Sequence, residues 1–169
     1  MIELFKKSLL VSSVVILTQI NLIAQSTTSS IKQNQLYLEL GGNGMIYSIN
    51  YERSLSENFT LRGGFGITPG LIFAEGTFIH IPVTASYLIG GVSSKFETGL
   101  GVTYFAGTDI EVFGLPSDDQ SLIFLTGIVG YRYISPGGFV FRIAFTPFYN
   151  SQAEPNFIPS GGLSFGFMF

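Results

Sequence analysis

Large apolar residues alternate with smaller or polar residues along most of this sequence, and this period of two limits the folds that the chain can adopt. The segment 139–149 shows the pattern clearly, because Phe139, Phe141 and Phe145 share one face of an extended strand and Arg142 lies on the other. Successive side chains of a β-strand point to opposite faces of a sheet. The pattern therefore predicts strands that have one face of large apolar side chains.

Eight such segments follow one another, separated by residues that are typical of turns. The predicted strands span residues 35–42, 45–53, 59–67, 78–88, 95–106, 121–133, 139–149 and 161–169. Short turns follow the second, fourth and sixth segments, whereas longer stretches follow the third, fifth and seventh. Outer-membrane barrels have this alternation, with short periplasmic turns and longer external loops. The first external connection is an exception, for which Gly42-Asn43-Gly44 predicts a tight Asn-Gly hairpin turn.

The shortage of charged residues points to the same architecture. Charged residues make up 11% of the chain and hydrophobic residues 46%, whereas a soluble domain carries about 25% charged residues. No uninterrupted apolar run reaches the ~18–20 residues of a membrane helix, and the best interior candidate, 122–131, is broken by Gly127 and Gly130. A closed barrel is the other structure that satisfies its backbone in lipid. The predicted fold is therefore an all-β, eight-stranded antiparallel up-and-down transmembrane β-barrel.

The first segment of the chain is predicted to be an export signal. Residues 1–24 have the pattern of a signal peptide, because two lysines precede an apolar core at 9–17. We expect cleavage after Ala24, and an uncleaved membrane anchor is the alternative. Residues 25–34 are then a polar, disordered lead-in, and residues 35–169 form the barrel domain.

Outward aromatic residues are expected near the periplasmic ends of the strands. Aromatic rings favour the boundary between lipid and water, so they should gather at one end of a membrane barrel. The residues predicted to form this periplasmic girdle are Tyr51, Phe59, Tyr87, Phe96, Tyr131, Tyr133, Phe139 and Phe169.

Pro82 conflicts with the predicted strand 78–88. Proline has no N–H to donate to a ladder, and a closed barrel has no edge strand on which to place it. We expect a bulge at this position, which leaves the facing of the nearby His80 open.

The inward faces of the predicted strands hold most of their charges. Three carboxylates and three guanidiniums are expected to form an interior charge network with a structural role: Glu39, Glu52, Arg62, Glu97, Arg132 and Arg142. Arg132 and Arg142 should nearly face each other, so carboxylates must lie between them, because an unpaired buried charge is costly. Eight strands leave an interior just wide enough for side chains. We therefore expect a salt-bridged, plugged lumen without a continuous channel.

Glycines on the inward faces leave an alternative open. They are Gly41, Gly64, Gly66, Gly99 and Gly101. They either leave a small pocket or pore toward the outer end, or make room for Tyr37 and Phe105.

The sequence predicts no enzyme, cofactor or metal site. His80 is the only histidine, no motif places a nucleophile beside it, and an orienting acid would have to come from Asp109, Asp118 or Asp119. One histidine without cysteine argues against zinc, and the spacing of Glu111, Asp118 and Asp119 is not specific for calcium. The glycine-rich pieces lack the helix and the Gly-Lys element of a phosphate loop. A net charge of −3 without a basic run gives no indication of nucleic acid as a partner.

The C-terminal strand GGLSFGFMF ends in phenylalanine and has aromatic residues at alternate positions. It resembles the signal by which the barrel assembly machinery recognises outer-membrane barrels. With FIHIPVTASYLIG, FETGLGVTYF and GYRYISPGGFVFRIAFTPF, it makes the chain similar to small outer-membrane β-barrel domain proteins of the Bacteroidetes type. The resemblance implies the outer membrane of a Gram-negative bacterium, contact with membrane lipid and lipopolysaccharide, and no catalytic motif.

Three functions follow as hypotheses. The leading one is a non-enzymatic role in envelope structure or surface interaction, through loops whose apolar contact points are Phe113, Leu115, Phe157 and Ile158. The second is a narrow channel or a carrier of small hydrophobic molecules, and the third is a lipid-modifying enzyme of the outer leaflet that uses His80. A soluble lipocalin-like barrel is the rival fold, and it would have an apolar lumen.

Overall fold

The computed structural model describes residues 32–69, 74–75, 77–107, 111–112, 115–116 and 121–169 of the chain. The predicted signal peptide at 1–24 and most of the predicted lead-in at 25–34 lie outside these ranges.

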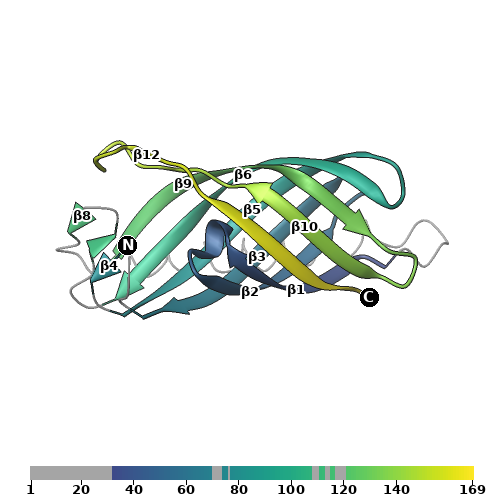
Figure 1. The fold of residues 1–169 in the computed structure, drawn as a ribbon, viewed down its shortest axis with the longest axis horizontal. Coiled ribbons are helices and arrows are strands. Elements are labelled where there is room, and N and C mark those ends of the chain that lie inside the picture. Colours follow the sequence, from purple (N-terminus) through teal and green to yellow (C-terminus); the bar gives the residue numbers. More distant parts are fainter. Residues whose placement is uncertain (1–31, 70–73, 76, 108–110, 113–114, 117–120) are drawn as a thin grey trace, which may run out of the picture. The chain divides into compact units, whose positions relative to one another are not determined.

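Eight long strands close into one antiparallel barrel (Figure 1). They are β1 (Asn34–Gly41), β2 (Tyr47–Ser54), β3 (Phe59–Thr68), β5 (Phe78–Gly90), β6 (Ser94–Gly107), β9 (Ser121–Ile134), β10 (Phe139–Phe145) and β13 (Gly161–Met168). Each strand pairs with its neighbours along the chain, and β13 also pairs with β1, which closes the barrel. The predicted all-β, eight-stranded antiparallel barrel is confirmed. The predicted strand ends lie within two residues of those in the structure, except that β10 ends at Phe145, four residues before the predicted end at 149.

Short elements gather at the loop end of the barrel, opposite the C-terminus (Figure 1). They are the strands β4 (Ala74–Glu75), β7 (Glu111–Val112), β8 (Leu115–Pro116), β11 (Phe148–Tyr149) and β12 (Phe157–Ile158). The 3-10 helix η1 (Gly42–Gly44), between β1 and β2 in the chain, lies within the barrel instead (Figure 1). β4, β7 and β8 form a small separate sheet. β11 follows β10 after two residues, pairs with β9 and carries β12 on its other edge.

The two faces of the barrel wall differ sharply in polarity. On β3, Leu61 and Phe65 are 47% and 48% exposed on the outside, whereas Arg62 is 2% exposed and faces the lumen. Large apolar side chains are exposed in the same way on every long strand. An apolar wall of this extent is costly in water and suits the hydrocarbon of a membrane.

Among the residues that the structure describes, no helix is long and apolar enough to cross a membrane.

The bulge that we expected at Pro82 is absent from the described strands. The pairs Gly63–Val83 and Gly66–His80 keep one register between β3 and β5, and the pairing of β5 with β6 is unbroken. A Cβ atom at Gly64 would lie 2.9 Å from Cγ of Pro82. The glycine therefore leaves room for the inward proline ring, so that the strand needs no extra residue.

The connection between β1 and β2 also differs from the prediction. It is not a tight external Asn-Gly turn, because Gly42, Asn43 and Gly44 form η1 and are buried. The N–H of Gly41 donates to the carbonyl of Ile46 at 2.9 Å, which closes the base of the loop. Gly41 and Gly42 have φ of 71° and 65°, a conformation that favours glycine and turns the loop inward.

The polarity of the wall gives a direct test of its surroundings. Val83 is 43% exposed and pairs with Val102 near the middle of β5 and β6, whereas Val92 is 90% exposed in the turn between these strands. We expect Val83→Arg to lower the free energy of unfolding in phospholipid vesicles by about 2–4 kcal/mol, and Val92→Arg by about 0–1 kcal/mol. Denaturant titrations of the folded barrel in vesicles measure both values. Equal values for the two variants would show that the middle of the wall does not face lipid.

Candidate functional site

The lumen holds a contiguous network of charged side chains. The structure brings together all six interior charges named from the sequence, and each is at most 2% exposed: Glu39, Glu52, Arg62, Glu97, Arg132 and Arg142. They come from β1, β2, β3, β6, β9 and β10. Their inward position follows from strand alternation, because each of them directly follows an outward apolar residue.

The charges alternate in sign along the network. Glu39 is ion-paired with Arg62 at 3.3 Å and also with Arg142. Arg142 in turn contacts Glu97 at 3.2 Å, and Glu97 contacts Arg132 at 2.8 Å. Arg132 also pairs with Glu52, which ends the series. Each charge inside the series therefore has an opposite charge on both sides, as burial in a low dielectric requires.

Arg132 and Arg142 are directly paired positions on β9 and β10. Two guanidiniums at this separation repel each other unless a carboxylate intervenes. Glu97 of β6 supplies that carboxylate, since one of its oxygens contacts Arg132 and the other contacts Arg142.

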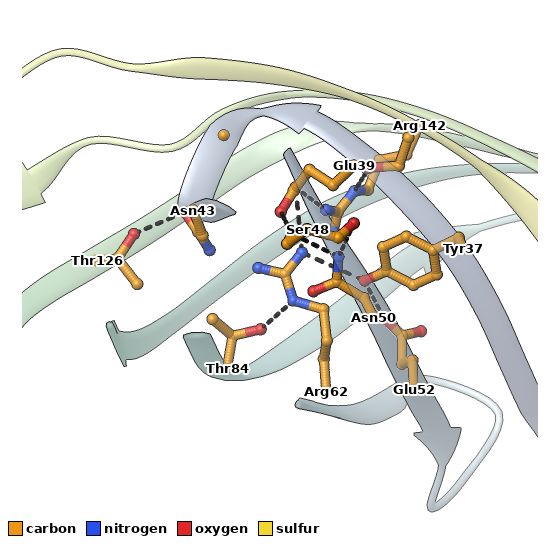
Figure 2. Close-up of polar contacts among 12 residues, drawn as sticks. Tyr37, Glu39, Asn43, Ser48, Asn50, Glu52, Arg62, Thr84, Thr126 and Arg142 are labelled. Carbon is orange, nitrogen blue, oxygen red and sulfur yellow. Dashed lines mark hydrogen bonds and ion pairs between the residues drawn. The ribbon is translucent and has the colours of Figure 1, made fainter. Parts of the chain in front are cut away.

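Tyr37 joins the two ends of the series, a role that the sequence analysis did not assign to it. Its hydroxyl donates to Glu52 at 3.4 Å and accepts from Nη1 of Arg62 at 3.2 Å (Figure 2). The guanidinium of Arg142 lies over its ring, 5.2 Å from the centroid. The alternation predicts the inward position of residue 37, but its contacts depend on side chains of three other strands, β2, β3 and β10.

Neutral side chains complete the network. Nε of Arg62 donates to Thr84 of β5 at 2.9 Å (Figure 2), and Nε of Arg142 donates to Ser164 of β13 at 3.3 Å. The amide of Gln35 donates to Glu52 at 3.1 Å. All eight long strands therefore contribute a side chain to the same hydrogen-bonded interior.

The η1 turn fills the lumen on the loop side of the charges. Asn43 is fully buried, and its side-chain oxygen accepts from the hydroxyl of Thr126 on β9 at 2.8 Å (Figure 2). The hydroxyl of Thr103 on β6 donates to the backbone carbonyl of Asn43 at 3.5 Å. A Cβ atom at Gly42 would lie 2.7 Å from a carboxylate oxygen of Glu39. The loop thus packs directly on the network, and we call residues Gly42–Met45 the plug.

A cluster of phenylalanines lies at the loop end of the lumen. Phe105 is fully buried and packs edge-to-face on Phe78 and Phe124, with ring centroids 5.7 Å and 5.6 Å apart. Phe148 is buried with them, and Met45 of the plug packs against the cluster. Aromatic edges and faces in this geometry attract each other and exclude water. The lumen is therefore occupied by charges, plug and aromatic rings in succession.

The structure settles the facing of His80, which the sequence left open: its side chain is buried in the lumen. Its Nε2 lies 3.1 Å from the carbonyl of Tyr47, and its Nδ1 lies 3.4 Å from the hydroxyl of Thr68. Asp109, Asp118 and Asp119, the predicted orienting acids, lie outside the described residues. Within the described ranges, no group of three or more histidine, cysteine, aspartate or glutamate side chains could hold a metal ion.

The inward glycines make room for neighbouring side chains. A Cβ atom at Gly66 would overlap the ring of His80, and one at Gly99 would lie 2.6 Å from the hydroxyl of Ser86. The space for Tyr37 comes instead from Gly166, its paired residue on β13, which the sequence analysis did not single out.

The eight aromatic residues named as a girdle all lie on the outside of the barrel, each at least 37% exposed. Two of them hold polar neighbours at the strand ends away from the plug. The hydroxyl of Tyr51 donates to Asn34 at 2.7 Å, and that of Tyr131 lies 2.9 Å from the hydroxyl of Ser94.

The four predicted loop contact points are described in part. Phe113 lies outside the described residues, and so does the side chain of Leu115. Phe157 is 50% exposed. Ile158 is partly buried and packs against the phenylalanine cluster, so it is not a free contact point.

The order of the charges predicts how the barrel responds to losing one of them. Arg142→Met leaves Glu39 and Glu97 with one partner each, and we expect it to lower the free energy of unfolding by about 3–5 kcal/mol. Adding Glu97→Gln leaves two complete pairs, Arg62 with Glu39 and Arg132 with Glu52. The double variant should therefore lose less stability than the sum of the single variants, by about 0.5–3 kcal/mol. Denaturation midpoints measure this coupling, and strict additivity would contradict the shared network.

Comparison with known proteins shows which solved structures share this fold. No protein-family model matches the chain, and no curated protein is significantly similar to it. The N-terminal β-barrel domain of Pseudomonas aeruginosa OprF matches with a TM-score of 0.61 and 19% identity over 81% of this chain and 98% of that one. Yersinia pestis Ail matches at 0.50 and 14% in its crystal structure, and at 0.52 and 13% in a phospholipid bilayer nanodisc, over 82% of this chain and 100% of Ail in both cases. At these identities the likeness concerns the fold, which is that of small outer-membrane β-barrels.

Proposed function

We propose that this chain is a non-enzymatic integral protein of a Gram-negative outer membrane, exported by its predicted signal peptide. Its lumen is closed, and it acts in envelope structure or in surface interaction through its loop end. Outer-membrane lipid and lipopolysaccharide are then its surroundings, and the barrel assembly machinery receives it through its C-terminal strand.

One observation carries this proposal, namely the inversion of polarity between the wall and the interior. The outside of every long strand exposes large apolar side chains, while six charged residues are buried in the lumen. A soluble ligand-binding barrel would need the reverse arrangement, with a polar outside and an apolar pocket. A membrane barrel of eight strands fits both faces.

The occupied lumen favours a structural or interaction role over transport. Solutes would have to pass the charge network, the plug and the phenylalanine cluster in turn. The polar interior also disfavours a carrier of hydrophobic molecules, because buried ion pairs offer no apolar contact. The proposal of an interaction role is also supported by the likeness to Ail, whose structure is described as that of an attachment invasion locus protein.

One feature favours an alternative function, a narrow polar channel through the lumen. Nη2 of Arg62, Nδ2 of Asn43 and Oδ1 of Asn50 are buried without a hydrogen-bond partner. Water or a small ion would satisfy such atoms, so a thread of water past the plug is the form that a channel would take here.

The proposed location is tested by a gel of the isolated outer-membrane fraction, run with and without boiling. A closed barrel resists detergent until it is heated, so we expect the unboiled protein in this fraction to migrate faster than the boiled protein. A soluble periplasmic protein without a heat shift would contradict the proposal.

Closure of the lumen is tested separately by conductance. The barrel folded into planar bilayers should give no steady current, because no continuous path crosses the three filled layers. Empty bilayers treated with the same detergent are the control. A steady current in the presence of the folded barrel would favour the polar channel instead.

A further inference from the structure

The outer wall of the barrel carries an apolar groove that begins at the middle of β6 and β9 and extends toward the loop end. It has a volume of about 330 Å³ and is lined by residues of β6, β9 and β11–β12, together with Pro147: Leu100, Gly101, Leu125, Thr126, Gly127, Tyr149 and Phe157. None of these side chains is charged. Leu100 is 75% exposed and Leu125 is 56% exposed, so the groove opens outward and not into the lumen.

The groove exists because small residues and a break in the strand interrupt the wall. Gly127 is paired with Leu100 and has no side chain on the outer face, where its neighbour Val129 is 47% exposed. After Phe145 the chain passes Pro147 and resumes as β11, and β12 then folds back beside it. Tyr149 and Phe157, a directly paired couple on these two short strands, form the wall of the groove on that side.

We propose that this groove holds one acyl chain of a membrane phospholipid, an inference that rests on the membrane location proposed above. The medium that faces the wall there is hydrocarbon, and van der Waals contact is the main attraction between apolar surfaces in lipid. A chain lying in the groove is contacted on several sides, whereas a chain on the flat wall is contacted on one. The lining offers no lysine or arginine. Lipopolysaccharide, with several phosphates, needs such partners more than a phospholipid with one, which favours a phospholipid as the source of the chain.

The test uses the chain folded in detergent micelles and titrated with a phospholipid that carries bromine on its acyl chains. The protein has no tryptophan, so a single introduced tryptophan reports bromine nearby. Ile123→Trp places the reporter on β9, two residues from Leu125 on the same face. Ile49→Trp is the matched control, since β2 lies four strands away in either direction and the two isoleucines are 59% and 60% exposed.

We expect equimolar brominated lipid to quench Ile123→Trp and to leave Ile49→Trp nearly unchanged. Gly127→Leu should abolish this difference by filling the groove, and it should fold, because its Cβ would meet only Pro147 at ordinary contact distances of 3.5 and 3.7 Å. Gly63→Leu is the control substitution, since a Cβ there meets nothing within 4 Å. The heat shift on gels verifies that each variant is folded.

Equal quenching at both reporters in a barrel that is inserted in membranes would overturn the groove as a lipid site and leave the membrane location standing. Absence of quenching at both, even when the chain is added to vesicles made wholly of brominated lipid, would overturn the membrane location itself. Lipopolysaccharide and unbrominated phospholipid can each be added as competitors that relieve the quenching of Ile123→Trp. If lipopolysaccharide is the better competitor, the assignment to a phospholipid is overturned. If the fluorescence of Ile123→Trp changes with protein concentration alone, a second copy occupies the groove and the assignment is also overturned.

Discussion

The hydrogen-bonded pairing of β1 with β13 is the constraint on which the rest of this structure depends. It joins the first long strand to the last, from Gln35 with Met168 to Gly41 with Gly162, and closes the eight long strands into a ring. Once the sheet is closed, eight strands define a lumen that side chains can fill. Every inward residue must then find its partners among other inward residues, and every outward residue must suit the surrounding medium.

The interior charges meet this demand and at the same time specify the register of the strands. A shift of one residue in any pairing would turn the strand over, which would place Arg62 or Glu97 on the apolar outside and an apolar residue in the network. Buried ion pairs are weak evidence for net stability, because desolvation offsets their attraction. Their clearer consequence here is specificity, since Glu39, Glu97 and Arg142 connect strands that are distant along the chain.

The strands and the inward charges were predictable from the sequence because both depend only on the period of two. Closure of the barrel then brings all inward residues into one lumen. The clustering of the six charges could therefore be predicted without knowing which of them form pairs. The plug was not predictable in the same way. Asn43 enters the lumen because Thr126, 83 positions later in the chain, is there to bond it, and the local Gly-Asn-Gly pattern favours an external turn equally well. The predicted bulge at Pro82 was wrong for a related reason. Gly64, which makes room for the proline ring, lies on a different strand.

Thr126 links the inside of the barrel to the groove on its outside. Pro147 accepts from the N–H of Gly127 at 3.0 Å but has no N–H to return, so the wall lacks one ladder bond at the floor of the groove. In hydrocarbon, a backbone carbonyl without a donor is costly. The hydroxyl of Thr126 lies 3.4 Å from the carbonyl of Gly127 and 2.8 Å from Asn43 of the plug. The single hydroxyl proton of Thr126 therefore has two possible acceptors. The shorter distance shows that its hydrogen bond to Asn43 of the plug is the stronger one. The same hydroxyl therefore connects the plug to the part of the wall where the ladder is weakest.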